Sequence, residues 1–264
     1  MLEKRVISFV ALIAVTIGTI FVDWLCGIAV AAFIAVGLHE FFAMLEHKGI
    51  RAYRCFGLAV GLLIPFSITF RFESTKGWEL LFIILSLLML ILMQFRSRQN
   101  SGVTVGISAT LFGVIYVSWF FSFLIRIRYL PGGLGLLAAV LLITKLGDIG
   151  AYLVGVRFGK RPLLPSISPK KSAEGAVAGL VFSLAGAFIS RPFLNFSGPH
   201  LAALGIVLGI IGQLGDLSES LVKRDCQVKD SGSILPGMGG ILDEMDSLLF
   251  TAPVFYFYIS TILK

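Results

Sequence analysis

Apolar segments follow one another along almost the entire chain of 264 residues. Hydrophobic residues make up 57% of the sequence and charged residues only 14%, whereas soluble domains carry roughly 25% charged residues. A segment of about 20 mostly apolar residues is long enough to cross the hydrocarbon core of a bilayer as a helix. The sequence therefore predicts an all-α polytopic integral membrane protein that leaves no room for a separate soluble domain.

The hydropathy pattern predicts about nine transmembrane helices, with ends placed to within a few residues. Their predicted bounds are 6–22, 24–45, 55–70, 78–93, 103–125, 133–156, 175–190, 201–215 and 247–263. Only Asp23 separates the first two, which form either a tight hairpin or one broken helix. We divide the chain into an N-terminal scaffold of helices (1–131) and a C-terminal catalytic region (132–264) within a single membrane domain.

Lysine and arginine are unevenly divided between the loops on the two sides of these helices. With the N-terminus inside, the inner loops hold fifteen of the 22 and the outer loops six, while Lys145 lies within a helix. The positive-inside rule therefore predicts a cytoplasmic N-terminus in the cell inner (plasma) membrane. The net charge of +7 then reflects topology, and we predict no nucleic-acid partner. Glu40, near the inner end of the second helix, is interpreted as an interfacial residue.

One segment, residues 212–247, departs from the apolar pattern. It holds seven of the fifteen acidic residues, three cations, and Pro-Gly and Gly-Gly turns. Hard cations such as Mg²⁺ take oxygen ligands and bridge carboxylates to phosphates, and Lys and Arg bind the remaining phosphate charge. This composition favours a metal-and-phosphate site that faces the cytoplasm, with an ordinary solvated loop as the alternative.

Small residues predict how this polar segment meets the bundle. Gly205, Gly209 and Gly212 recur at i, i+4 and i+7, a spacing that lets another helix approach closely. Asp216 continues the same stripe at i+11. We therefore expect its carboxylate to point into the bundle rather than into lipid.

Ionisable side chains also lie within or beside the predicted helices. Lys145 and Asp148 are three residues apart and can pair, and Tyr152 follows one turn later. Such residues inside a membrane are costly and indicate function, although a structural ion pair is the alternative. Asp243 and Asp246 share one face at the start of the last helix, where they hold a cation or simply cap the helix.

The other polar loop, residues 157–174, is basic. Five cations against Glu174 give it a local charge of +4. Its SPKKS stretch places Ser168, Lys170, Lys171 and Ser172 directly before a helix that we expect to begin near 173–175. The free N–H groups of a helix start favour anions. Non-specific binding of anionic lipid heads is the alternative.

The polar segment reads SLVKR at 220–224, KDSG at 229–232, PGMGG at 236–240 and DEMD at 243–246. In this order and spacing it resembles the C-terminal signature of the phosphatidate cytidylyltransferases, or CDP-diacylglycerol synthases. The resemblance is detailed over 148–247 and rests mainly on hydropathy before that. Two positions depart from the signature, since Met238 stands where the family has His and Glu244 where it has Arg.

The resemblance implies a metal-dependent nucleotidyltransferase of phospholipid biosynthesis. Its substrates would be CTP and phosphatidic acid, its products CDP-diacylglycerol and pyrophosphate, its cofactor Mg²⁺ and its surroundings membrane lipid. A second cation and a homodimer are left open. The implied metal ligands are Asp216, Asp243 and Asp246, which with Lys223 are the implied catalytic residues. The implied substrate-binding residues are Asp148, Tyr152, Ser168, Lys170, Lys171, Ser172, Lys223, Arg224, Lys229 and Asp230.

Two other functions have to be weighed against this one. A CTP-dependent polyprenol or lipid-alcohol kinase would share the metal and nucleotide needs but transfer the γ-phosphoryl group. A transporter of an anionic solute is a non-enzymatic alternative. Transporters typically carry internal repeats, however, whereas the polar residues here crowd into one half of the chain. The signature favours the cytidylyltransferase over both.

Overall fold

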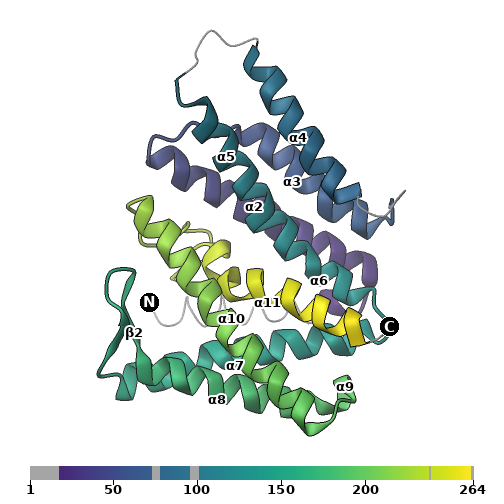
Figure 1. Ribbon diagram of the computed structural model, residues 1–264, viewed down its shortest axis with the longest axis vertical. Helices are drawn as coiled ribbons and strands as arrows, with labels where there is room; N and C mark the ends of the chain where they lie inside the picture. Colours follow the sequence, from purple (N-terminus) through teal and green to yellow (C-terminus); the bar gives the residue numbers. More distant parts are fainter. Residues whose placement is uncertain (1–17, 73–77, 96–100, 238, 263–264) are drawn as a thin grey trace. The chain divides into compact units, whose positions relative to one another are not determined.

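The computed structural model describes residues 18–72, 78–95, 101–237 and 239–262, which are mostly helical (Figure 1). The helices are α2 (Asp23–His47), α3 (Arg54–Thr69), α4 (Trp78–Phe95), α5 (Val103–Gly113), the π-helix η1 (Val114–Trp119), α6 (Phe120–Arg128), α7 (Gly133–Phe158), α8 (Ala173–Ile189), the short α9 (Arg191–Leu194), α10 (Gly198–Asp225) and α11 (Ile241–Ile262). Two short strands, β1 (Pro162–Leu164) and β2 (Ser168–Ser172), pair as an antiparallel hairpin that was not predicted.

Most of the predicted transmembrane segments correspond to helices of the structure. Within the described ranges, five helical stretches are long and apolar enough to cross a membrane: α2, the run Val103–Arg128, α7, α10 and α11. α3, α4 and α8 are shorter apolar helices. The all-α membrane fold is confirmed. Most of the first predicted helix, 6–22, lies outside the described residues, so the count of nine remains a prediction.

Two compact units share the chain. The first combines Met1–Ile125 with Cys226–Leu242, and the second combines Arg126–Asp225 with Asp243–Lys264. The polar segment 212–247 therefore contributes to both units, because its middle part belongs to the first and its flanks to the second. The predicted division into scaffold and catalytic region is a functional one and remains a prediction.

In the first unit, α2 and α3 pack closely because α3 offers glycines to large side chains of α2. Leu38, Phe41 and Phe42 are completely or almost completely buried. An added Cβ would meet the Phe42 ring at Gly57 and Leu38 at Gly61, so no larger residue fits at either position without rearrangement. Close contact without a side chain between the helices is the way helices associate in lipid.

In the second unit, α7 and α8 run side by side and α8 also packs on α10 (Figure 1). The glycine stripe of α10 faces its neighbours as the spacing predicts. A Cβ at Gly205 would meet the backbone of α8, and one at Gly209 would meet side chains of α8. Beside Gly212 lies Thr251 of α11. The stripe continues to Asp216, which places this carboxylate at the polar end of the packed helices.

Candidate active site

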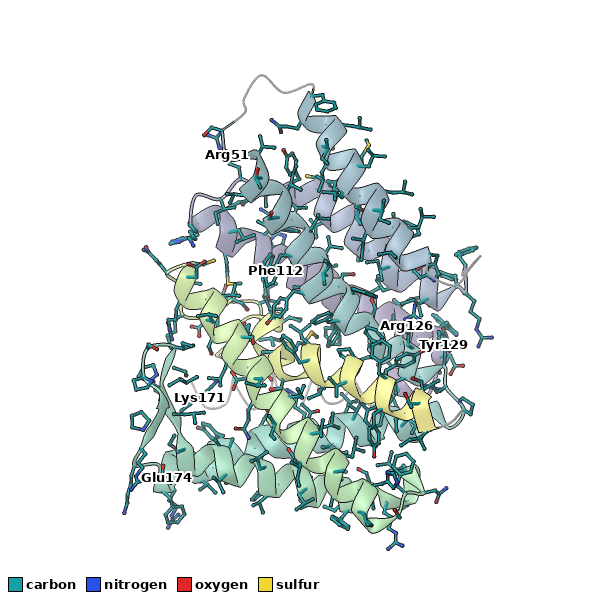
Figure 2. The ribbon with its side chains drawn as sticks, viewed as in Figure 1. Arg51, Phe112, Arg126, Tyr129, Lys171 and Glu174 are labelled. Carbon is teal, nitrogen blue, oxygen red and sulfur yellow. The ribbon has the colours of Figure 1, made fainter. Side chains whose placement is uncertain are left out.

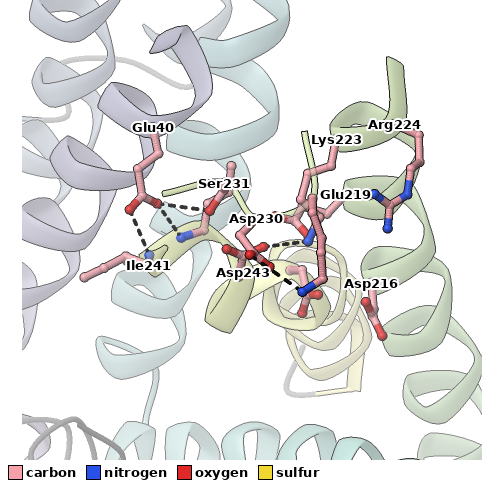
Figure 3. Close-up of polar contacts among 12 residues, drawn as sticks. Glu40, Asp216, Glu219, Lys223, Arg224, Asp230, Ser231, Ile241 and Asp243 are labelled. Carbon is pink, nitrogen blue, oxygen red and sulfur yellow. Dashed lines mark hydrogen bonds and ion pairs between the residues drawn. The ribbon is translucent and has the colours of Figure 1, made fainter. Parts of the chain in front are cut away.

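Lys223 lies between two carboxylates at the polar end of α10. Its Nζ donates a hydrogen bond to Asp243 Oδ1 over 2.5 Å and forms an ion pair with Glu219 (Figure 3). The side chains of Lys223 and Asp243 are each 11% exposed, and that of Glu219 is fully buried. Since a buried charge is costly unless it is paired, each of the three holds the others in place.

Asp216 faces the β1–β2 hairpin. Its Oδ1 lies 2.5 Å from Nζ of Lys171, which stands on β2 (Figure 2). Nε of Arg224 donates to the carbonyl of Ile167, in the turn of the same hairpin, over 3.3 Å. The basic loop and the acidic end of α10 therefore meet in the second unit, in agreement with their opposite local charges.

The same hairpin leads directly into α8, which begins at Ala173 near the expected position. Ser172 caps the helix, since its Oγ accepts a hydrogen bond from the backbone N–H of Gly175 over 3.1 Å. Glu174 accepts hydrogen bonds from the backbone N–H groups of residues 160 and 161 over 3.0 and 3.2 Å. These bonds lower the pKa of the Glu174 carboxyl, and the bond from residue 160 has the largest effect. They hold the residues just before β1 close to the start of α8, which follows β2.

Polar contacts also join α7 to the first turns of α11. Nζ of Lys145 donates to the backbone carbonyl of Glu244 over 2.7 Å and lies 3.5 Å from Asp148 Oδ2, so the predicted pair is present. The hydroxyl of Ser247 donates to Asp148 Oδ1 over 2.9 Å. Glu244, one of the two departures from the signature, thus contributes its main chain to this contact; Met238, the other, lies outside the described residues.

Asp246 lies in the first turns of α11. Its side chain is buried, and its Oδ1 accepts a hydrogen bond from the backbone N–H of Ser247 over 2.5 Å. The hydroxyl of Ser247, which donates to Asp148 of α7, lies 3.2 Å from the same oxygen. Ser247 therefore contacts one carboxyl group of α7 and one of α11.

The contacts described above do not include five other predicted residues. Lys229 and Asp230 belong to the first unit, are 71% and 55% exposed, and form a loose ion pair of 3.9 Å. Tyr152 exposes its side chain on α7, Lys170 is exposed on β2, and Ser168 is partly buried at the start of that strand. The substrate-binding roles of these five residues stay predictions.

Two contributors received no role from the sequence. Glu219 precedes Lys223 by four residues, the spacing at which helix side chains meet, so this signal could have been used. Ser247 gave no such signal, because its partner Asp148 lies 99 residues earlier in the chain. Only the packing of α11 on α7 brings that pair together.

The sequence model of a protein family, described as the cytidylyltransferase family, matches residues 3–262 of this chain. The chain belongs to the cytidylyltransferase family. Among its relatives, the phosphatidate cytidylyltransferase of Synechocystis sp. is 32% identical over 293 residues, which cover 98% of this chain and 97% of that one. The enzyme of that name from Bacillus subtilis is 36% identical over 233 residues, or 86% of each chain. The one from Mycobacterium tuberculosis is 42% identical over 147 residues, covering 55% of this chain and 45% of that one.

In this cytidylyltransferase, the acids at the junction of α7, α10 and α11 outnumber the lysines. Six carboxyl groups stand against three ammonium groups: Asp148, Asp216, Glu219, Asp243, Glu244 and Asp246 against Lys145, Lys171 and Lys223. Lys223 pairs with Oε2 of the buried Glu219, whereas Oε1 has no hydrogen-bond partner in the described structure. Spare negative charge on hard oxygen donors suits a divalent cation.

The carboxylates fit such a cation by their chemistry but are not gathered as its ligands. Among the described residues, no group of three or more His, Cys, Asp and Glu side chains is arranged to hold a metal ion. The ammonium groups of Lys171 and Lys223 instead hold Asp216 and Asp243. A cation that enters here would have to replace these two lysines.

The Lys223→Met variant tests how far the buried pairs support the fold. Without the ammonium group, Glu219 and Asp243 become uncompensated charges, which should lower the free energy of unfolding by about 3–5 kcal/mol. The double variant Lys223→Met/Glu219→Gln should recover much of that loss, because it also removes a buried charge. Unfolding of the purified protein in detergent measures both.

A matched control is Lys229→Met, which removes a lysine that is 71% exposed and should leave the stability unchanged. A Lys223→Met variant as stable as the wild type would contradict the assigned role of the pair.

Proposed function

We propose that this chain is a phosphatidate cytidylyltransferase, which makes CDP-diacylglycerol and pyrophosphate from CTP and phosphatidate. The observation that carries the proposal is the full-length similarity to relatives of that name, with two parts of the resembling signature, 220–224 and 243–246, falling on the lysine and carboxylate cluster described above. The membrane helices suit a lipid substrate, because phosphatidate keeps its acyl chains in the bilayer while its phosphate reaches the polar edge.

The reaction joins two polyanions. A phosphate oxygen of phosphatidate attacks the α-phosphorus of CTP, a new P–O bond forms, and the bond from the α-phosphorus to the bridging oxygen breaks as pyrophosphate leaves. The protein has little covalent chemistry to perform, so its contribution is to hold both substrates in line and to stabilise the charge that develops. Lysine and arginine side chains suit this task because they bind phosphate oxygens with charged hydrogen bonds.

The lysines of the cluster are placed to change partners during this process. Lys171 and Lys223 hold carboxylates in the structure, and Arg224 lies against the β1–β2 hairpin. When phosphate groups arrive, these cations can pair with them instead. We assign phosphate binding to Lys171, Lys223 and Arg224, and propose that exposed Lys170 and Lys229 add to it.

Asp216, Asp243 and Asp246 would then be free to hold Mg²⁺, the metal that the family resemblance implies. When bound, Mg²⁺ would neutralise phosphate charge and help to orient the two substrates. The main-chain bond from Lys145 and the hydroxyl bond between Ser247 and Asp148 keep the first turns of α11 against α7. These contacts position two of the three aspartates.

For its setting, we propose the inner membrane, with the N-terminus and the polar loops on the cytoplasmic side. The excess of lysine and arginine in the loops assigned to that side supports this orientation. CTP is a cytosolic nucleotide, so a site on this face can be supplied directly.

Labelled CTP distinguishes cytidylyl transfer from the kinase reaction. We expect purified protein with phosphatidate and Mg²⁺ to move label from the α-phosphate of CTP into the lipid and to release label from the γ-phosphate as pyrophosphate. Removal of the divalent cation with EDTA should stop both. Separation of lipid and water-soluble products measures the outcome.

A lipid product that carries the γ-label, together with release of CDP, would contradict the proposed function and show that the protein is a lipid kinase. The control is the Asp225→Asn variant, which changes an exposed acid at the end of α10 and should retain full transfer.

Reporter fusions test the proposed orientation. A reporter placed in the loop 48–54 should lie in the cytoplasm, and one fused after Lys264 should lie outside. The reason is that an odd number of predicted transmembrane helices separates the two reporter positions. Alkaline phosphatase, active only outside, and green fluorescent protein, fluorescent only inside, give opposite readings at each site. Both fusions on one side would refute the nine-helix topology.

A further inference from the structure

Glu40 is a buried carboxylate of the first unit. It lies in α2 and is only 3% exposed, so its carboxylate packs inside the protein rather than on its surface. Oε1 accepts a hydrogen bond from the backbone N–H of Ile241 over 3.1 Å, and Oε2 accepts one from that of Leu242 over 2.9 Å (Figure 3). The hydroxyl of Ser231 donates to the same Oε2 over 3.3 Å.

Ile241 and Leu242 are the first two residues of α11, where backbone N–H groups have no partner within the helix. A helix start is usually capped by a Ser, Thr, Asp or Asn at the preceding position. Here that position is Gly240, which has no side chain to offer. Glu40 supplies the missing acceptors from a different helix, and its negative charge also suits the positive end of the helix dipole.

Two glycines make room for this carboxylate. A Cβ built on Gly232 or on Gly240 would collide with the Glu40 carboxyl group, and one on Gly240 would also collide with the hydroxyl of Ser231. Both positions belong to the segment 226–240, which connects α10 to α11. The segment therefore passes close to the Glu40 carboxylate at two places, and each place is a glycine.

Glu40 ties together the two ends of a loop. Ser231 is held at one end and Ile241 at the other, while between them the backbones of Leu235 and Gly239 exchange hydrogen bonds of 2.9 and 3.2 Å across the Pro-Gly turn. The described residues of this segment, 231–237 and 239–241, thus form a loop whose ends are fixed by one side chain. Lys229 and Asp230 directly precede it, and Asp243 follows two residues after it.

We propose that Glu40 is a positioning residue for cytidylyl transfer. By fixing the start of α11 and closing the loop before it, Glu40 sets the position of the aspartates in the first turns of that helix. It does so without touching the substrates. The inference rests on the proposed function, because the reaction is one of its readouts.

The Glu40→Gln variant is the test. A carboxamide keeps the shape but replaces one acceptor with an NH₂ donor, so one backbone N–H at the start of α11 faces another donor. We expect the Mg²⁺ concentration for half-maximal activity to rise and kcat/KM to fall, each roughly ten- to hundredfold, as for other residues that support metal ligands. Hydrogen exchange of the amides in 231–242 should become faster, whereas exchange in α7 should not change.

The matched control is Glu46→Gln, which changes an exposed glutamate of the same helix that pairs with Arg54. It should leave kinetics and exchange as in the wild type. A folded Glu40→Gln protein with unchanged Mg²⁺ dependence would overturn the positioning role, even if its stability were lower. If Glu40→Gln does not fold, Ser231→Ala removes only the hydroxyl contact. It should shift both readouts in the same direction by less, and no shift in either would overturn the proposal.

Hydrogen exchange separates this inference from the proposed function. Suppose that the wild-type protein transfers no cytidylyl group, while the amides of 231–242 still exchange faster in Glu40→Gln. This result would contradict the proposed function and the role of Glu40 in it. Normal cytidylyl transfer by the wild type, with no effect of Glu40→Gln on exchange or kinetics, would contradict the inference about Glu40 alone.

Discussion

Glu219 has no solvent exposure, and its carboxylate is held by the ammonium group of Lys223 in the next turn of α10. Lys223 also reaches Asp243 at the start of α11, so one lysine neutralises acids on two helices. An unpaired charge in such surroundings would cost several kcal/mol. Glu219 and Asp243 can therefore be buried together because Lys223 lies between them. In this way Lys223 joins α10 to the start of α11, and Lys171 joins the hairpin to Asp216 of α10.

Glu40 is stabilised differently. Its hydrogen bonds come from backbone N–H groups and a hydroxyl, which cannot leave as a lysine side chain can. This difference suits two kinds of work. Flexible ammonium groups can exchange a carboxylate for a phosphate, whereas a carboxylate bound to the backbone keeps a helix start in one place. A phosphoryl-group chemistry that relies on positioning and charge needs both.

The sequence predicted the apolar part of the fold well, because hydropathy follows burial in lipid. Helix 133–156, for example, is α7 (Gly133–Phe158). The polar ends were less predictable. The membrane segment was predicted to end at 215, whereas α10 continues to Asp225, since a helix that leaves the apolar layer loses its hydropathy signal but keeps its hydrogen bonds. Local spacing also indicated the Lys145–Asp148 pair. It could not indicate that Glu40 caps a helix 201 residues away, because that contact depends on the packing of the first unit.

The central claim is that lysines occupy carboxylates which a divalent cation takes in the working enzyme. Titration of the purified protein with Mn²⁺, followed by its electron paramagnetic resonance signal, tests this without any turnover. The account predicts saturable binding to the wild type, at least tenfold weaker binding to Asp216→Asn, and tighter binding to Lys171→Met, in which the competing ammonium group is gone. Binding of equal strength to all three proteins would contradict it.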